Sequence, residues 1–232
     1  MNSVHKTALA LSGGVDSTTV LQWLLDRGDS VVCVQFQYQS KHNIFEVAAA
    51  QQVYQFYARK SNLSSLSCIQ VDLSGIFTYM KSNLLKGQGE IPEGHYADET
   101  MKQTVVPARN MIFLSVMAGL AESYGCNSIA LGIHQGDHAI YPDCRPEFYN
   151  AMQHAVELGT GGKVAVEAPF LYATKSEIVK YGLTYGVPYH LTRTCYKEQE
   201  LSCGKCGSCI ERVEAFALND CHDPITYEDE RR

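Results

Sequence analysis

Short apolar or β-branched runs alternate with longer amphipathic stretches along most of this chain. The short runs predict five strands, at residues 7–11, 31–37, 67–72, 128–133 and 164–168. The amphipathic stretches predict six helices, at residues 17–27, 44–60, 75–85, 108–124, 146–158 and 175–185. Because strands that alternate with helices pair in parallel, the pattern predicts an α/β fold with a doubly wound, mainly parallel five-stranded sheet.

Two kinds of signal mark the ends of these helices. Thr174 and Glu177 have the spacing of a capping box, in which two side chains satisfy free backbone N–H groups at a helix start. Gly28 and Gly186 each follow a helical stretch, where glycine commonly adopts the left-handed conformation that ends a helix. We therefore expect a helix start near residue 175 and helix ends near both glycines.

Functional residues are expected in the loops that follow the strands. In an open parallel sheet, ligands bind beyond the carboxyl ends of the strands. Residues 86–104 are different, because they carry no periodic pattern and contain several glycines and a proline. This stretch is either a mobile lid over the site or a surface loop. The loops that follow strands are residues 12–17, 37–42, 134–145 and 169–175.

Composition narrows the class of protein. The 232 residues are 45% hydrophobic and 19% charged, as in an ordinary globular protein. No run approaches the roughly 20 apolar residues of a membrane span, and no export signal precedes the first strand, so we expect a cytoplasmic protein away from membranes. The formal net charge of −6 argues against direct binding to nucleic acid, which normally takes a basic surface.

The loop after the first predicted strand carries the clearest chemical signal. Ser12, two glycines, Val15, Asp16 and Ser17 stand between a strand and a helix. Free backbone N–H groups at such a helix start bind phosphate, although a glycine pair can also serve the geometry of a turn alone. The Walker motif, with its lysine, is absent from the sequence.

This SGGxDS run resembles the signature of the N-type ATP pyrophosphatases, also called PP-loop proteins. The resemblance implies an adenine nucleotide alpha hydrolase-like, Rossmann-like fold and cleavage of ATP between its α and β phosphates. It implies catalytic roles for Asp16, Ser17 and Lys175, with Mg²⁺ bound together with ATP. The residues expected to bind ATP are Leu11, Ser12, Gly13, Gly14, Val15, Asp16, Ser17, Thr18, Thr19, Val20, Leu21 and Arg109.

Four cysteines near the C-terminus have the spacing of a metal site. Cys195, Cys203, Cys206 and Cys209 include two consecutive C-x-x-C steps, and four thiolates are enough to close a tetrahedral structural zinc site. An iron–sulfur cluster and a redox pair are the alternatives. We expect residues 1–190 to form the ATP pyrophosphatase domain, and residues 191–232 to form a small helical arm that binds Zn²⁺.

Further motifs narrow the resemblance to one family. Residues 106–110 (VPARN), 141–145 (YPDCR), 169–170 (PF, with Lys175 following) and 194–196 (TCY) accompany the loop and the cysteines in the order typical of 7-cyano-7-deazaguanine synthases. The similarity runs from about residue 6 to about residue 218. It implies a ligase that converts 7-carboxy-7-deazaguanine and ammonia to the nitrile with ATP, through an amide, in queuosine biosynthesis. It also implies a homodimer.

Substrate contacts follow from the same resemblance and from the loops. A carboxylate such as Asp143 could accept hydrogen bonds from a guanine-like edge, and Arg145 could hold the substrate carboxylate. Phe36 and Tyr141 could stack on the ring system. The residues expected to bind the substrate are Phe36, His42, His134, Asp137, Tyr141, Asp143 and Arg145.

One loop departs from the family pattern. Residues 134–140 read HQGDHAI where a Cys-Glu-Thr-Asp-Phe-Ser-Gly-like run is typical, and Val15 stands where Gln is typical. The first alternative is therefore a paralogue that transfers the activated deazaguanine carboxylate to another amine, such as a protein amine. A tRNA-modifying thiolase and a nucleotide-binding scaffold without turnover are the more distant alternatives.

Overall fold

A five-stranded parallel sheet forms the centre of the computed structural model, which describes residues 4–60, 65–95 and 99–228. The strand order is β3-β2-β1-β4-β5, and each neighbouring pair is parallel. The expected doubly wound, adenine nucleotide alpha hydrolase-like sheet is therefore confirmed. The strands are β1 (Lys6–Ala10), β2 (Ser30–Gln37), β3 (Leu66–Asp72), β4 (Ser128–Ala130) and β5 (Ala165–Glu167).

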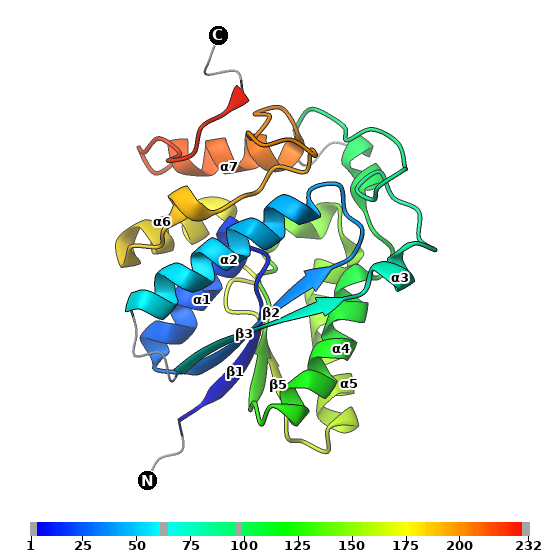
Figure 1. Cartoon of the computed structure of the whole chain (residues 1–232), viewed down its shortest axis with the longest axis vertical. Helices are drawn as coiled ribbons and strands as arrows, with labels where there is room; N and C mark the ends of the chain where they lie inside the picture. Colours follow the sequence, from blue (N-terminus) through cyan, green and yellow to red (C-terminus); the bar gives the residue numbers. More distant parts are fainter. Residues whose placement is uncertain (1–3, 61–64, 96–98, 229–232) are drawn as a thin grey trace.

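Helices cover both faces of the sheet and its carboxyl edge (Figure 1). α1 (Val15–Arg27) and α2 (Asn43–Lys60) lie on one face, and α4 (Arg109–Ser123) and α5 (Pro146–Gly159) lie on the other. α6 (Lys175–Tyr185) and α7 (Gly207–Ala217) cross above the strand ends. None of the helices in the described ranges is long and apolar enough to span a bilayer.

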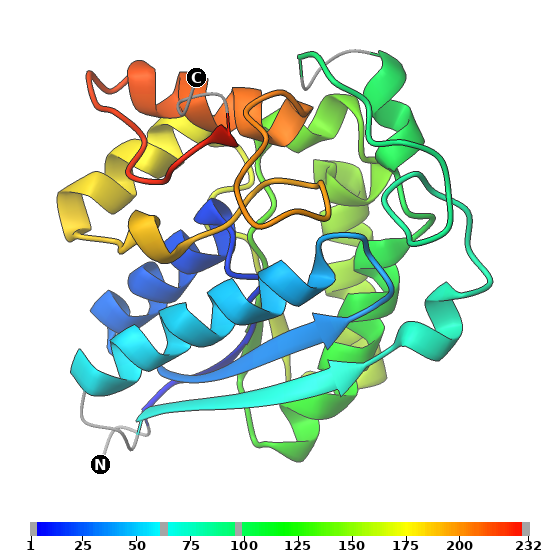
Figure 2. The same ribbon diagram turned by 45° about the horizontal axis from the view of Figure 1, so that its top comes forward.

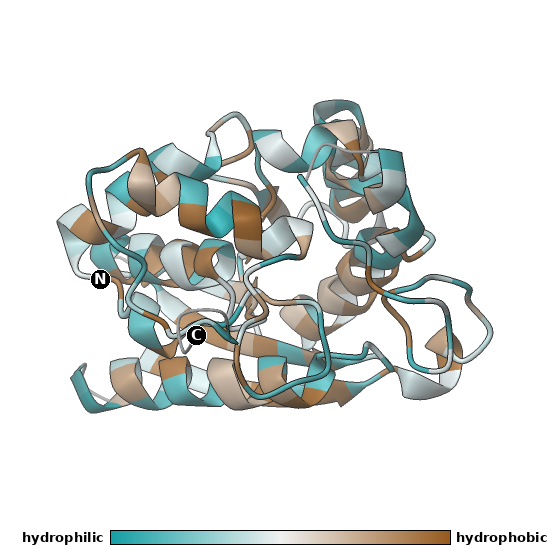
Figure 3. Ribbon diagram, turned by 90° about the horizontal axis from the view of Figure 1, so that it is seen from above, coloured by the Kyte–Doolittle hydropathy of each residue, from teal (hydrophilic) through white to brown (hydrophobic). Residues whose placement is uncertain are grey.

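The core divides along the sheet. Leu9 and Cys33 pack with α1 and α2, and Val32 and Ile129 pack with α4 on the opposite face. Hydrophobic and hydrophilic residues alternate along the helices, as the brown and teal segments of Figure 3 show, and the apolar sides of α1, α2 and α4 pack on the sheet. Burial of these apolar sides, at roughly 25 cal/mol per Å², supplies most of the stabilisation of such a layered fold.

The caps of the helices agree with the sequence. Thr174 and Glu177 form both hydrogen bonds of a capping box at the start of α6. Gly28 and Gly186 adopt left-handed conformations at the ends of α1 and α6, with φ of 90° and 73°. The two predictions of helix ends are confirmed.

The predicted helix over residues 75–85 is wrong beyond its first residues. α3 spans only Ser74–Phe77, and the chain then turns toward the loop after β2. Leu84 and Leu85 are both buried, and Leu85 forms an isolated antiparallel bridge with Ser40 of the loop after β2. Backbone bonds from the N–H of Lys41 to the carbonyl of Leu84 and from the N–H of Lys86 to the carbonyl of Gln39 tie this segment to that loop, with turns on either side of Leu85. Long-range pairing therefore overrides the local helical pattern.

The C-terminal arm packs on the carboxyl edge. Phe216 of α7 lies in a cluster with Ile178 of α6, and Arg212 is fully buried in an ion pair with Asp223, with an N···O distance of 2.7 Å. Figure 2 shows the loop before α7 lying beside the segment around residues 86–95, where Gly94 donates to the carbonyl of Lys205. The lid prediction covers residues 86–104, of which 96–98 lie outside the described residues, and it stays a prediction.

Gly13 is the tightest point of the fold near the site. Its φ is +78°, and a Cβ there would lie 2.3 Å from the backbone nitrogen of Ala50. We expect Gly13→Ala to destabilise the protein by roughly 3 kcal/mol or more, because α2 must move as well as the turn. Gly28→Ala is the matched control, since Gly28 has φ +90° but open space, and it should cost about 1 kcal/mol. Urea unfolding of both variants measures the difference, and equal losses would contradict the steric argument.

Candidate active site

The SGGxDS loop forms a closed turn between β1 and α1. Ser12 Oγ and Ser17 Oγ lie 3.0 Å apart, and the N–H of Gly14 donates to Ser12 Oγ over 3.2 Å. Gly14 stands at the N-cap position of α1 and forms no side-chain cap. The first turn of the helix therefore directs its N–H groups and its positive dipole end at the carboxyl edge of the sheet, as a phosphate requires.

Lys175 faces this loop from the start of α6. Its Nζ lies 2.6 Å from Oδ2 and 2.7 Å from Oδ1 of Asp16, and the lysine is only 7% exposed. Nζ also lies 3.0 Å from Nε2 of His134, whose Nδ1 accepts the N–H of Gly136. The capping box of α6 thus places a buried ammonium against the carboxylate of the phosphate loop, rather than a solvated lysine at a helix end.

The charges of this pair stabilise one another. Burial raises the pKa of Asp16, but Lys175 and His134 outweigh that effect, and the pKa lies below its ordinary value. Burial lowers the pKa of Lys175, but Asp16, Glu211 and Asp137 raise it well above its ordinary value. Asp16 is therefore a carboxylate and Lys175 an ammonium at neutral pH.

A cavity of about 1260 Å³, its open mouth included, joins the loop to an aromatic chamber. The loop end contains Asp16, Lys175 and Glu211. In the chamber, Phe36 stacks on Phe113 with ring centroids 4.1 Å apart. The cavity is therefore polar and charged at one end and suited to a flat ring at the other. Tyr38, His42, Glu46, Arg109, Asn110, Tyr141, Cys144, Arg193 and Tyr196 also line it.

The expected ATP-binding residues divide into two groups. The loop residues and Arg109 line the cavity, except Gly13, which lies against Ala50. Thr18, Thr19, Val20 and Leu21 do not line it, because they are buried in α1; for example, Thr19 Oγ1 bonds to the carbonyl of Val15 and to Tyr189. Side chains of this second group belong to the packing of α1.

The expected substrate residues also divide. Phe36, His42, Asp137 and Tyr141 line the cavity, whereas His134 is buried behind Lys175. Asp143 and Arg145 do not line it. Oδ2 of Asp143 accepts the backbone N–H of Asn110 at the start of α4, and Nε of Arg145 donates to the carbonyl of His138 in the same loop, so both side chains hold backbone groups.

Several cavity residues gave no clear signal in the sequence. Tyr38 directly follows β2, and this position at a strand end is the one sequence feature that could have placed it in the site. Burial raises the pKa of Tyr38 to about 12. Oε2 of Glu46 lies 3.2 Å from Nε2 of His42. Burial raises the pKa of Glu46, but His42 lowers it by more, so the pKa lies below its ordinary value. Glu211 stands in the arm, far along the chain from the loop that it faces.

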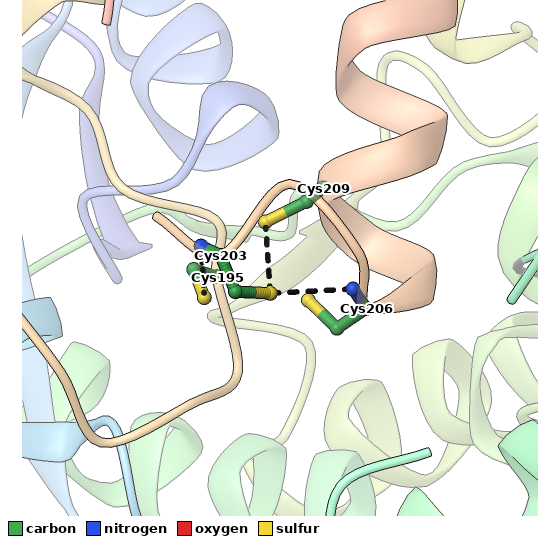
Figure 4. Close-up of side chains that lie close together, drawn as sticks. All are labelled: Cys195, Cys203, Cys206 and Cys209. Carbon is green, nitrogen blue, oxygen red and sulfur yellow. Dashed lines mark hydrogen bonds between the residues drawn. The ribbon is translucent and has the colours of Figure 1, made fainter. Parts of the chain in front are cut away.

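The four cysteines of the arm converge. All four are buried, and their sulfur atoms lie within 4.8 Å of one another. Figure 4 shows the side chains pointing toward a common centre, with Cys209 at the start of α7. Sγ of Cys203 also accepts backbone N–H bonds from Lys205 and Cys206, which favours a thiolate. The cluster can hold a metal ion.

The parallel sheet, the SGGxDS loop and the opposing lysine define a PP-loop ATP-binding protein. Residues 6–220 match the model of the family described as queuosine biosynthesis protein QueC. A 7-cyano-7-deazaguanine synthase from Methanoregula boonei is 44% identical to this chain over 223 residues, which is 96% of this chain and 99% of that protein. One from Pseudoalteromonas atlantica is 41% identical, with coverage of 97% and 100%. The chain belongs to the QueC family of queuosine biosynthesis proteins.

Among solved structures, the U34-tRNA thiolase NcsA from Methanococcus maripaludis is similar at a TM-score of 0.49 and 17% identity. The alignment covers 93% of this chain and 65% of that protein. The similarity is too low to support a conclusion about function.

Proposed function

We propose that this protein converts 7-carboxy-7-deazaguanine and ammonia to 7-cyano-7-deazaguanine with ATP, through an amide. The observation that carries the proposal is the single cavity that joins the phosphate loop, with Asp16 and Lys175, to a chamber of aromatic and arginine side chains. A nucleoside triphosphate suits the end at the phosphate loop, and a flat ring with a carboxylate suits the aromatic chamber. Family membership agrees with both halves.

The first step makes a poor electrophile reactive. The substrate carboxylate oxygen attacks the α-phosphorus of ATP, and the bond to the β-phosphate breaks, so that pyrophosphate leaves. The N–H groups of the loop and the Ser12 and Ser17 hydroxyls hold the pyrophosphate, and Lys175 balances the charge that develops on it. Ammonia then attacks the acyl carbon and AMP leaves, which gives the amide. A second ATP adenylates the amide oxygen with loss of pyrophosphate and one N–H proton, and that oxygen then leaves with AMP as the second N–H proton departs, which forms the nitrile.

Substrate recognition falls to the chamber rather than to Asp143 and Arg145. Phe36 and Tyr196 offer aromatic surfaces, and Glu46 offers a carboxylate for the donor edge of a guanine-like ring. Burial lowers the pKa of Arg109, but Tyr38, Tyr196 and Asp143 together raise it by more. The pKa therefore lies above its ordinary value, and the guanidinium stays charged. Arg109 can therefore hold the substrate carboxylate bidentately.

Two metals belong to the proposal. Asp16 is the carboxylate of the loop end that would hold Mg²⁺, which when bound with ATP neutralises phosphate charge. The cysteine cluster would hold structural Zn²⁺: tetrahedral Zn–S bonds of about 2.3 Å place sulfur atoms about 3.8 Å apart, and Sγ of Cys203 and Sγ of Cys209 are 3.9 Å apart. An iron–sulfur cluster separates its thiolates with several inserted atoms, so the close sulfurs favour one ion. The homodimer, the domain boundary at residue 190 and the cytoplasmic location stay predictions.

The test is product identification. Purified protein is incubated with ATP, Mg²⁺, ammonium and 7-carboxy-7-deazaguanine, and mass spectrometry follows bases and nucleotides. We expect the amide to appear first, then the nitrile, with AMP and pyrophosphate formed together. Base consumption that requires a protein or another amine in place of ammonium would favour the paralogue, in which the same activated carboxylate meets a different acceptor. No base consumption at all, in protein that retains its metal, would contradict the proposal.

A further inference from the structure

Helix α7 carries a carboxylate from the cysteine arm into the cavity. Glu211 stands two residues after Cys209, in the part of α7 next to the cluster. Its side chain is 16% exposed, lines the cavity, and has Oε2 3.5 Å from Nζ of Lys175. Among the described residues, Lys175 therefore forms ion pairs with Asp16 from the phosphate loop and Glu211 from the arm, and Asp137 adds a further negative charge nearby.

The loop after β4 leaves room for this contact. A Cβ on Gly136 would lie 2.5 Å from Oε1 of Glu211 and 2.8 Å from Cε1 of His134. Only a residue without a side chain lets Glu211 and His134 lie together beside Lys175. Three segments that are far apart in the sequence thus surround the ammonium of Lys175: the phosphate loop, the loop after β4 and the arm.

We propose that Glu211 is a positioning residue, which keeps Nζ of Lys175 in the cavity once nucleotide phosphates compete with the lysine's contact to Asp16. This inference rests on the proposed use of ATP. The triphosphate is strongly anionic and draws Lys175 toward itself, while it repels the Asp16 carboxylate. Glu211 approaches Lys175 from the arm and gives the buried ammonium a second anionic partner, so the lysine stays charged and localised.

A charge-neutral variant tests the role. Glu211→Gln keeps the shape and removes the charge, and we expect kcat for ATP consumption to fall by about tenfold. The KM for ATP should change by less than about twofold, because the variant also removes a negative charge that opposes the phosphates. Glu214→Gln, on the same helix but exposed and paired only with His95 in the described structure, is the control and should match the wild type.

Gly136→Ala provides a second, independent variant. The added methyl group would lie 2.5 Å from Oε1 of Glu211 and 2.8 Å from Cε1 of His134, and the backbone there is not left-handed, so we expect the fold to survive while both side chains shift. We expect kcat to fall at least as far as in Glu211→Gln, and the double variant to be no slower than Gly136→Ala alone, since Gly136→Ala already displaces the Glu211 carboxylate. A fully multiplicative loss in the double variant would contradict the proposal.

A structural readout separates this inference from the proposed function. In the complex with a nonhydrolysable ATP analogue, Nζ of Lys175 should contact both Glu211 and a phosphate oxygen in the wild type, and should be displaced in Glu211→Gln. This result does not depend on which base is the substrate. An unchanged kcat in Glu211→Gln would overturn the inference. Loss of bound metal together with a lowered melting temperature in this variant would also overturn it, because that result would show that Glu211 has a structural role.

Discussion

Replacing Asp16 by Asn is expected to lower ATP consumption by about a thousandfold. The carboxylate lies in the first turn of α1, at the edge of the cavity, and contacts Lys175 at 2.6 Å. Asn keeps the shape of the side chain but carries no charge to balance the Lys175 ammonium, and under the proposed function it would hold Mg²⁺ more weakly than a carboxylate does. Release of pyrophosphate measures the loss.

Asp26→Asn is the control for this variant. Asp26 lies on the same helix, is exposed, and accepts a hydrogen bond from Gln22, away from the cavity. Its replacement should leave turnover within about twofold of the wild type, as surface substitutions usually do. Retention of more than a tenth of the wild-type activity in Asp16→Asn would refute our assignment of the loop.

The same variant predicts a dependence of stability on pH. The pKa of Asp16 in the folded protein lies below the ordinary value of 3.8. A carboxyl with a lowered pKa stabilises the fold above its unfolded pKa, and this contribution disappears as the pH falls through the folded pKa. Asp16→Asn should therefore have a lower free energy of unfolding than the wild type near neutral pH. This difference in stability should shrink as the pH falls below about 4.

Replacing Cys206 by Ser is expected to release the bound metal and to destabilise the arm. Structural zinc sites contribute apparent binding free energies on the order of 10 kcal/mol, and loss of one thiolate opens the tetrahedron. Because Arg212 and Asp223 also hold α7, we expect the loop over residues 195–206 to unfold before the sheet does. Elemental analysis and calorimetry measure the metal content and the melting temperature.

Cys221→Ser is the matched control for the cluster. Cys221 is exposed and lies outside the group of four sulfur atoms. Its replacement should change neither the metal content nor the melting temperature. A Cys206→Ser protein that still carries a full equivalent of zinc would contradict the assignment of the four ligands.

Local patterns predicted the parts of the fold that depend on neighbours in the chain. The capping box at Thr174 and the left-handed Gly28 follow from backbone hydrogen bonds within a few residues. The strands followed from apolar runs, because strands of a doubly wound sheet are buried on both faces. The helix predicted over residues 75–85 failed because Leu84 and Leu85 are buried by a distant loop, which no local pattern records.

The candidate site divides in the same way. The phosphate loop was visible because all its groups are contiguous in the sequence. Asp143 and Arg145 were assigned to the substrate because they stand in a loop at the correct edge. Asp143 instead accepts from Asn110, which tertiary packing brings close, and Arg145 donates to His138, a contact within the loop that no motif records. Glu46 and Tyr196 line the cavity from different segments; Glu46 carried no motif, and the TCY motif that contains Tyr196 did not show that its side chain faces the cavity.

The sequence by itself determined that this protein has a parallel α/β sheet, an ATP-type phosphate loop and four clustered thiols, because each is written in contiguous residues or short spacings. Only the tertiary structure decided what faces the loop. Asp16, His134, Lys175 and Glu211 come from four separate segments, and they meet because the carboxyl ends of parallel strands and the arm share one edge of the sheet. Their charges can stabilise one another only at that meeting point, where burial strengthens every electrostatic contact.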